Sequence, residues 1–282
     1  MPPPDDATVR TRDMYIEHPH GRLFARIWEP RETPAAATRA PIILFHDSLG
    51  CVALWRSFPA RLSTATGRRV VAYDRLGFGR SDAREDKPTL DFVADEARTY
   101  FPAVLEQLGG GPFIALGHSV GGGMAIHCAA AYADQCLALI TEAAQVFAED
   151  LTLESIAAAK VQFREPGQVE RLQRYHGDKA QWVLDAWTDT WLHPEFRHWT
   201  LTPVLPRVRC PVLAIHGAHD EYGSRRHPEM IAELSAGPSR CEILPGTYHV
   251  PHREDEAAIA SRVCEFIDSI NARPLENRLA VP

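Results

Sequence analysis

The sequence predicts an α/β protein, with a mostly parallel, doubly wound sheet and an inserted helical cap. Short apolar runs rich in Val, Ile, Leu and Phe alternate with amphipathic segments along most of the 282 residues, as expected of strand and helix units in a parallel sheet. The alternation stops between residues 146 and 206. We therefore expect a core made of segments 1–145 and 207–282, and a helical cap or lid at 146–206.

The expected elements begin with a hairpin at the sheet edge. Residues 13–17 and 23–28 flank Pro19-His20-Gly21, a turn signal that indicates an antiparallel pair. Buried strands are expected where short apolar runs are bounded by Gly, Pro or Asp. These runs are 41–46, 69–74, 113–116, 136–140, 210–215 and 241–244. Amphipathic periodicity predicts a helix at 254–270. A helical run is also expected at 124–133, after the Gly-rich segment 117–122.

The predicted cap is rich in aromatic residues. It holds four of the six tryptophans, and most of them are expected to pack a small helical subdomain, because large aromatics contribute heavily to core burial. Some would instead line an apolar pocket beneath a lid. The candidate substrate contacts are Leu49, His118, Trp182, Trp187 and Trp191.

Composition excludes several classes of function. The net charge is −7, from 30 basic and 37 acidic residues, and no basic run suits a nucleic-acid backbone. No apolar run approaches the roughly 20 residues of a membrane helix, and the acidic, proline-rich start at 2–6 is unlike a signal peptide. These observations predict a cytoplasmic protein with a small-molecule substrate and no membrane or nucleic-acid partner, either monomeric or homo-oligomeric.

Metal and cofactor signatures are absent from the sequence. The six cysteines are scattered, with no C-x-x-C pair, which argues against a zinc site or a disulfide framework. There is no dinucleotide loop, phosphate-binding loop or H-E-x-x-H motif. We therefore expect neither a cofactor nor a metal.

A candidate nucleophile lies at Ser119. The sequence Gly117-His118-Ser119-Val120-Gly121 follows a predicted strand and precedes a predicted helix. A serine on such a sharp turn needs small residues two positions away on each side, and the helix N-terminus directs N–H groups at developing negative charge. The pattern predicts a nucleophilic serine.

A serine nucleophile needs a base and an acid that orients the base. His249 is favoured as the base because it follows the predicted strand 241–244 and precedes the last helix; His252 is the second choice. Asp220 is favoured as the acid because it ends the loop after the strand 210–215, and Glu142 after the preceding strand is the alternative.

These residues resemble the α/β-hydrolase fold superfamily. The resemblance rests on the sharp strand-to-helix turn at Ser119, known as a nucleophile elbow, on the chain order Ser119, Asp220, His249 and on the sequence Asp-Arg-Leu-Gly-Phe-Gly-Arg-Ser at 74–81. It spans roughly residues 42–267. It implies an eight-stranded, mostly parallel sheet, a helical lid after the sixth strand and a triad at the carboxyl edge. The serine excludes relatives that need a carboxylate at the elbow, such as haloalkane dehalogenases and epoxide hydrolases.

The resemblance also implies an oxyanion hole. In that family the second donor comes from a loop that usually begins His-Gly, whereas Asp47 replaces the Gly here. By position the donors are the N–H groups of Ser48 and Val120, and we expect the Asp47 carboxylate to point away or to bond to backbone.

The sequence thus predicts a serine hydrolase that cleaves a carboxylic ester of a small or medium, partly apolar substrate through an acyl-enzyme. Other enzymatic readings are a C–C bond hydrolase of ring-cleavage products, a lactonase or a thioesterase. Acidic ring-cleavage products would need an arginine in the pocket. A non-enzymatic reading is a small-molecule receptor that retains the hydrolase fold.

Overall fold

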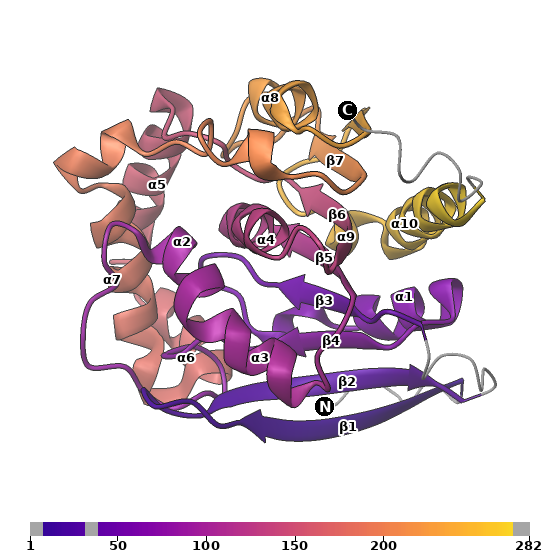
Figure 1. Cartoon of the computed structure of the whole chain (residues 1–282). Coiled ribbons are helices and arrows are strands. Elements are labelled where there is room, and N and C mark those ends of the chain that lie inside the picture. The colour runs from indigo at the N-terminus through magenta and orange to yellow at the C-terminus, as the bar shows by residue number, and fades with distance from the viewer. Residues whose placement is uncertain (1–7, 32–38, 273–282) are drawn as a thin grey trace.

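The computed structural model describes residues 8–31 and 39–272 and contains an eight-stranded sheet (Figure 1). The strands are β1 (Val9–Ile16), β2 (Leu23–Pro30), β3 (Ile42–Phe45), β4 (Val70–Tyr73), β5 (Phe113–His118), β6 (Cys136–Glu142), β7 (Val212–Gly217) and β8 (Ser239–Leu244). Their spatial order is β1-β2-β4-β3-β5-β6-β7-β8. The expected N-terminal hairpin is confirmed, because β1 pairs antiparallel with β2.

The strands from β3 to β8 are parallel, so their carboxyl ends meet at one edge. This arrangement confirms the α/β fold class. Several strands extend further than the apolar pattern indicated, and two of them end on polar side chains, because β5 continues to His118 and β6 to Glu142. Both added polar ends are buried, at 1% and 0% exposure, which a reading based on hydrophobic runs could not anticipate.

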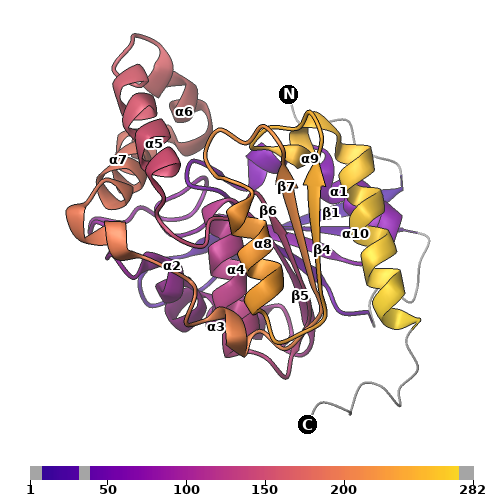
Figure 2. The same ribbon diagram turned by 90° about the horizontal axis from the view of Figure 1, so that it is seen from above.

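Helices cover both faces of the sheet (Figure 2). On one face lie α1 (Phe58–Thr66) and α10 (Glu256–Asn271), and on the other lie α3 (Phe101–Gln107), α4 (Val120–Ala131) and α8 (Arg226–Leu234). The buried apolar residues accordingly form two clusters, one on each face. Further short elements include α2 (Phe92–Asp95), the five-residue π-helix that follows it (Glu96–Tyr100) and α9 (Pro251–Glu254).

A helical excursion connects β6 to β7. It contains α5 (Asp150–Gln162), α6 (Gln168–His176) and α7 (Ala180–Trp191), which lie to one side of the sheet in Figure 2. A bridge between Phe147 and Thr200 joins the two ends of this excursion, and the Leu201 N–H donates to the Val146 carbonyl at 2.7 Å. The chain therefore leaves the core and returns to it at nearly the same place. Its separation into a distinct cap domain stays a prediction.

Residues 2–6, on which the signal-peptide argument rests, lie outside the described residues. Within 8–31 and 39–272, no helix combines the length and hydrophobicity that a membrane span requires.

Helix α4 approaches the sheet too closely for a side chain at Gly121. A Cβ on this residue would lie 2.1 Å from the carbonyl oxygen of Phe45 in β3. Because the obstacle is backbone, it cannot move aside by changing rotamer. The helix and the strand must separate to admit even a methyl group.

We expect Gly121→Ala to lower the free energy of unfolding by about 2 kcal/mol or more through this overpacking. Urea unfolding followed by far-ultraviolet circular dichroism measures the change. Gly123→Ala in the same helix is the matched control, because its Cβ would meet side chains and not backbone, the nearest being a Val93 methyl at 3.1 Å, and it should change the stability by less than about 1 kcal/mol. Equal losses in both variants would contradict the argument.

Candidate active site

Ser119 lies at the turn between β5 and α4 with φ 54° and ψ −127°. Positive φ is strained for a residue with a side chain. Two neighbouring glycines permit it: a Cβ on Gly117 would lie 2.2 Å from the carbonyl oxygen of Gly121. The Ser119 N–H also donates to the Glu142 carbonyl at 2.8 Å. These contacts hold the serine at the carboxyl edge of the sheet.

Ser119, His249 and Asp220 are brought together by the ends of three strands. His249 follows β8 and its Nε2 lies 3.0 Å from the Ser119 Oγ. Its Nδ1 lies 2.8 and 2.9 Å from the two carboxylate oxygens of Asp220, which follows β7. The result is a continuous chain of hydrogen bonds from a hydroxyl through an imidazole to a carboxylate.

Asp220 is held in its charged form. Burial by itself would raise the pKa of this carboxyl, but the hydrogen bond and charge of His249, the charge of His216 and the backbone N–H of Tyr222 outweigh burial and lower the pKa. The Tyr222 N–H donates to Oδ1 at 2.8 Å, and the His216 Nε2 lies 3.4 Å from Oδ2. The acid is therefore positioned to orient the imidazole.

Glu142 and His252, the alternative acid and base, pair with each other. His252 Nδ1 lies 2.7 Å from the Glu142 Oε2, and both side chains are almost fully buried. Burial lowers the pKa of His252, although the charge of Glu142 opposes the shift. The His252 and His118 rings lie edge to face, with centroids 5.0 Å apart. The structure thus pairs Glu142 with His252 and not with His249, and neither side chain hydrogen-bonds to the Ser119 hydroxyl.

The loop of residues 47–50 forms another wall of the site. Asp47 turns back onto its own loop: its Oδ1 accepts the Leu49 N–H at 2.9 Å, and its Oδ2 lies 3.4 Å from the His118 Nδ1. This matches the expectation that its carboxylate bonds to backbone. Ser48 lines the cavity above this turn. Val120 is the first residue of α4, where N–H groups lack an intrahelical acceptor.

His118 connects two loops of the site. Its Nε2 lies 2.8 Å from the carbonyl oxygen of His249, while its Nδ1 faces Asp47. Burial would lower the pKa of His118, but the close contact with Asp47 and the charges of Asp47 and Glu142 outweigh burial and raise the pKa. The ring therefore links the loop after β3 to the loop that carries His249.

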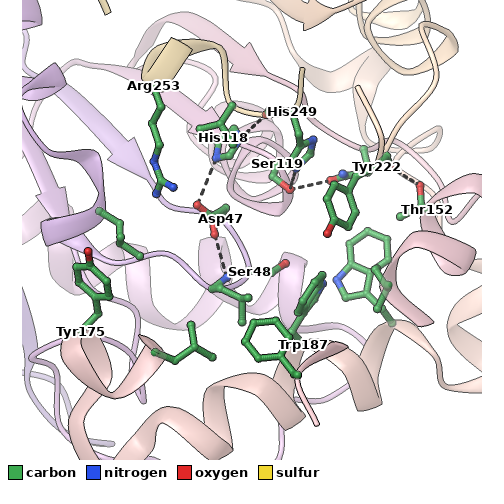
Figure 3. Close-up of a pocket in the computed structure, with 18 of the residues that line it drawn as sticks. Asp47, Ser48, His118, Ser119, Thr152, Tyr175, Trp187, Tyr222, His249 and Arg253 are labelled. Atoms are coloured by element: carbon green, nitrogen blue, oxygen red, sulfur yellow. Dashed lines mark hydrogen bonds and ion pairs between the residues drawn. The ribbon is translucent and has the colours of Figure 1, made fainter. Parts of the chain in front are cut away.

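A cavity of about 390 Å³ opens above Ser119, between the sheet edge and helices α5 to α7 (Figure 3). Four of the five candidate substrate contacts line it: Leu49, His118, Trp187 and Trp191. The fifth, Trp182, does not. Its ring packs against Phe78 at a centroid separation of 5.6 Å and covers Gly77, whose Cβ would lie 2.4 Å from the indole. This tryptophan packs α7 against the core and does not contact the cavity.

Several cavity residues carried no signal in the sequence. The Ser119 hydroxyl lies 3.4 Å from the Gln145 Oε1, and the Tyr222 ring lies 4.9 Å from that of His249. Arg253 in α9 also lines the cavity. These residues belong to loops and short helices whose positions depend on long-range packing. Among the described residues, no group of three or more His, Cys, Asp or Glu is arranged to hold a metal ion.

Comparison with known proteins identifies the architecture. A family model described as the alpha/beta hydrolase fold matches residues 40–184, just over half of the chain. A solved structure of a thermophilic esterase from Thermogutta terrifontis superposes with a TM-score of 0.70 at 18% identity, covering 92% of this chain and 99% of that one. At this identity the likeness shows the fold alone.

Curated relatives include a lipase and an esterase. The chain is 33% identical over 115 residues to a (lyso)-N-acylphosphatidylethanolamine lipase from Bos taurus, covering 41% of this chain and 33% of the relative. It is 34% identical over 110 residues to a bifunctional esterase/perhydrolase from Acinetobacter calcoaceticus, covering 39% of this chain and 36% of the relative. The matched segments span about a third of the length of these relatives.

The buried Glu142 and His252 pair should be measurable as a coupling energy. We expect Glu142→Ala to lower the free energy of unfolding by about 3 kcal/mol, because it leaves a buried imidazole without its partner. In a double-mutant cycle with His252→Ala, the losses should be non-additive by about 1 kcal/mol or more, measured by urea unfolding. Strictly additive losses would show that the two side chains do not interact.

Proposed function

Because the chain belongs to the α/β-hydrolase fold family, we propose that it is a serine hydrolase that cleaves a carboxylic ester through an acyl-enzyme. The observation that carries this proposal is the hydrogen-bond chain from Ser119 through His249 to Asp220, with links of 3.0 and 2.8 Å at the floor of a cavity. Such a chain is the arrangement that activates a serine hydroxyl.

In the acylation step, the Ser119 Oγ attacks the ester carbonyl carbon while His249 Nε2 takes the hydroxyl proton. Asp220 accepts the Nδ1–H of the imidazole, fixes its tautomer and stabilises the imidazolium. The N–H groups of Val120 and Ser48 donate to the carbonyl oxygen as it becomes an oxyanion. When the tetrahedral intermediate collapses, His249 returns the proton to the leaving alcohol.

In the deacylation step, water attacks the acyl-enzyme with the same residues in the same roles. His249 Nε2 takes a proton from the water, and the second tetrahedral intermediate is stabilised by the same two N–H groups. Collapse releases the carboxylic acid and returns the proton to the Ser119 oxygen. No step requires a metal or a cofactor.

The cavity suits a small or medium substrate with an apolar part. Its volume of about 390 Å³ lies at the lower end of the range for small-molecule sites. Apolar side chains from the excursion face it, including Ile156, Phe163, Trp187 and Trp191. We assign helices α5 to α7 the role of a cap that selects the substrate, whereas the sheet edge supplies the reaction chemistry.

The decisive experiment measures hydrolysis of p-nitrophenyl esters of increasing acyl length by the wild-type protein and Ser119→Ala. We expect turnover with an optimum in chain length, and a loss of at least about 1,000-fold in kcat in the variant, whose circular dichroism should remain native. Residual activity near that of the wild type would refute the assignment of Ser119. No activity on any ester would favour the C–C hydrolase or receptor readings.

The acid can be tested separately. We expect Asp220→Asn to lower kcat by about 1,000-fold or more, because the amide no longer holds His249 in the productive tautomer. Glu142→Gln is the matched control, since Glu142 contacts His252 instead of the base, and its kcat should stay within about threefold. If the Glu142 variant lost activity and the Asp220 variant did not, the acid would lie on β6.

A further inference from the structure

The cavity wall contains an arginine whose side chain has no hydrogen-bond or ion-pair partner among the described residues. Arg253 lines the cavity from α9, four residues after His249, and Figure 3 shows its side chain directed toward the cavity. Its Nε is buried and makes no hydrogen bond. Among the described residues, no carboxylate forms an ion pair with this guanidinium. A buried, charged donor that lacks an acceptor is costly unless a ligand supplies one.

Asp47 is near Arg253 but is already engaged. Its two carboxylate oxygens face the Leu49 N–H and His118, and it packs over its own turn, where a Cβ on Gly50 would lie 2.9 Å from its Oδ2. The charge of Arg253 contributes to the lowered pKa of Asp47, without a hydrogen bond between them. The donor face of Arg253 thus remains available to a ligand.

A second arginine, Arg171, lines the same cavity from α6. Arg171 and Tyr175 lie four residues apart on α6, so both project from one face of that helix. Arg171 makes only a long hydrogen bond, 3.4 Å, to Gln168, and forms no ion pair within the described part of the chain. In Figure 3, Tyr175 lies at the same side of the view as Arg253, opposite Tyr222 and Thr152.

The cavity therefore differs in charge from the rest of the molecule. The whole chain carries a net charge of −7, whereas the cavity lining contains two arginines and one acid, and that acid is turned into its own loop. The remaining wall is largely apolar. The cavity thus combines an apolar wall with a cationic region, which is typical of a site for a molecule that has an apolar body and one anionic group.

We propose that Arg253 and Arg171 form an anion subsite, and that the substrate is an acidic ester, with a carboxylate or phosphate-type group in addition to the scissile ester. Guanidinium groups suit both anions because their planar N–H pairs match two oxygens at once. The identification of the substrate as an ester rests on the proposed function, whereas the anion subsite stands on the cavity itself.

The test compares three ligands of matched length on the Ser119→Ala variant, which cannot form an acyl-enzyme. They are monomethyl glutarate, methyl 4-phosphonobutanoate and the neutral dimethyl glutarate. We expect isothermal titration calorimetry to give a Kd at least about 10-fold lower for one or both anions than for the neutral diester. The carboxylate and phosphonate arms then identify which anion the subsite prefers.

Arginine substitutions localise the effect. In the Ser119→Ala background, Arg253→Gln and Arg171→Gln should each reduce the ratio of neutral to anionic Kd toward one, and Arg253→Lys should retain part of it. Arg171 is exposed at the rim, so the change in the Kd ratio on its replacement does not depend on the packing of α9. Arg174→Gln on the same helix is the matched control, because Arg174 does not line the cavity, and it should leave the ratio unchanged.

The outcomes distinguish a failure of the anion-subsite proposal from a failure of the proposed function. Equal affinity for charged and neutral ligands, no binding of either anion, or an Arg174 effect as large as that of Arg253 would overturn the anion subsite whatever the protein hydrolyses. With Ser119 restored, the ratio of kcat/KM for p-nitrophenyl hemiglutarate to that for p-nitrophenyl pentanoate should fall about 10-fold in Arg253→Gln. An intact preference for anions with no ester turnover would overturn the esterase proposal alone.

Discussion

The positive φ of Ser119 is the constraint on which the rest of the site depends. A serine with φ 54° is strained, and it persists only because the surrounding packing permits no alternative. Helix α4 lies directly on the backbone of β3 and β5, with glycine at 117 and 121 where they touch. The buried helix compensates for the local strain, and the serine side chain is left at the edge of the sheet. The same close contact makes these two glycines structurally irreplaceable.

Parallel strands then gather the other groups at the same edge. Asp220 and His249 are 29 residues apart, and Ser119 is 130 residues from His249, yet all three follow strands whose carboxyl ends meet. Acid and histidine pairs at this edge include Asp220 with His249, Glu142 with His252, and Asp47 with His118. Since Glu142 and Asp47 engage His252 and His118, His249 is the histidine of these pairs whose Nε2 lies beside the Ser119 hydroxyl.

Much of the fold could be predicted because burial imposes a pattern on sequence. The strand cores and the N-terminal hairpin followed from apolar runs and turn residues. Strand ends could not be predicted this way, since His118 and Glu142 are polar yet buried and paired. Trp182 was indistinguishable from Trp187 and Trp191 in the sequence, because the choice between core and cavity depends on which face of α7 meets Phe78.

The sequence by itself determined the fold family and the strained turn at Ser119, and it narrowed the catalytic base and the catalytic acid to two candidates each. These features depend on local spacing and on residue type. Only the tertiary structure decided which histidine faces the serine, which acid faces that histidine and which side chains surround the cavity. Arg253 illustrates the reason. Its place in the cavity wall depends on how α9, the loop after β3 and the helical excursion come together around the cavity, and a long-range arrangement of this kind leaves no periodic pattern in one sequence.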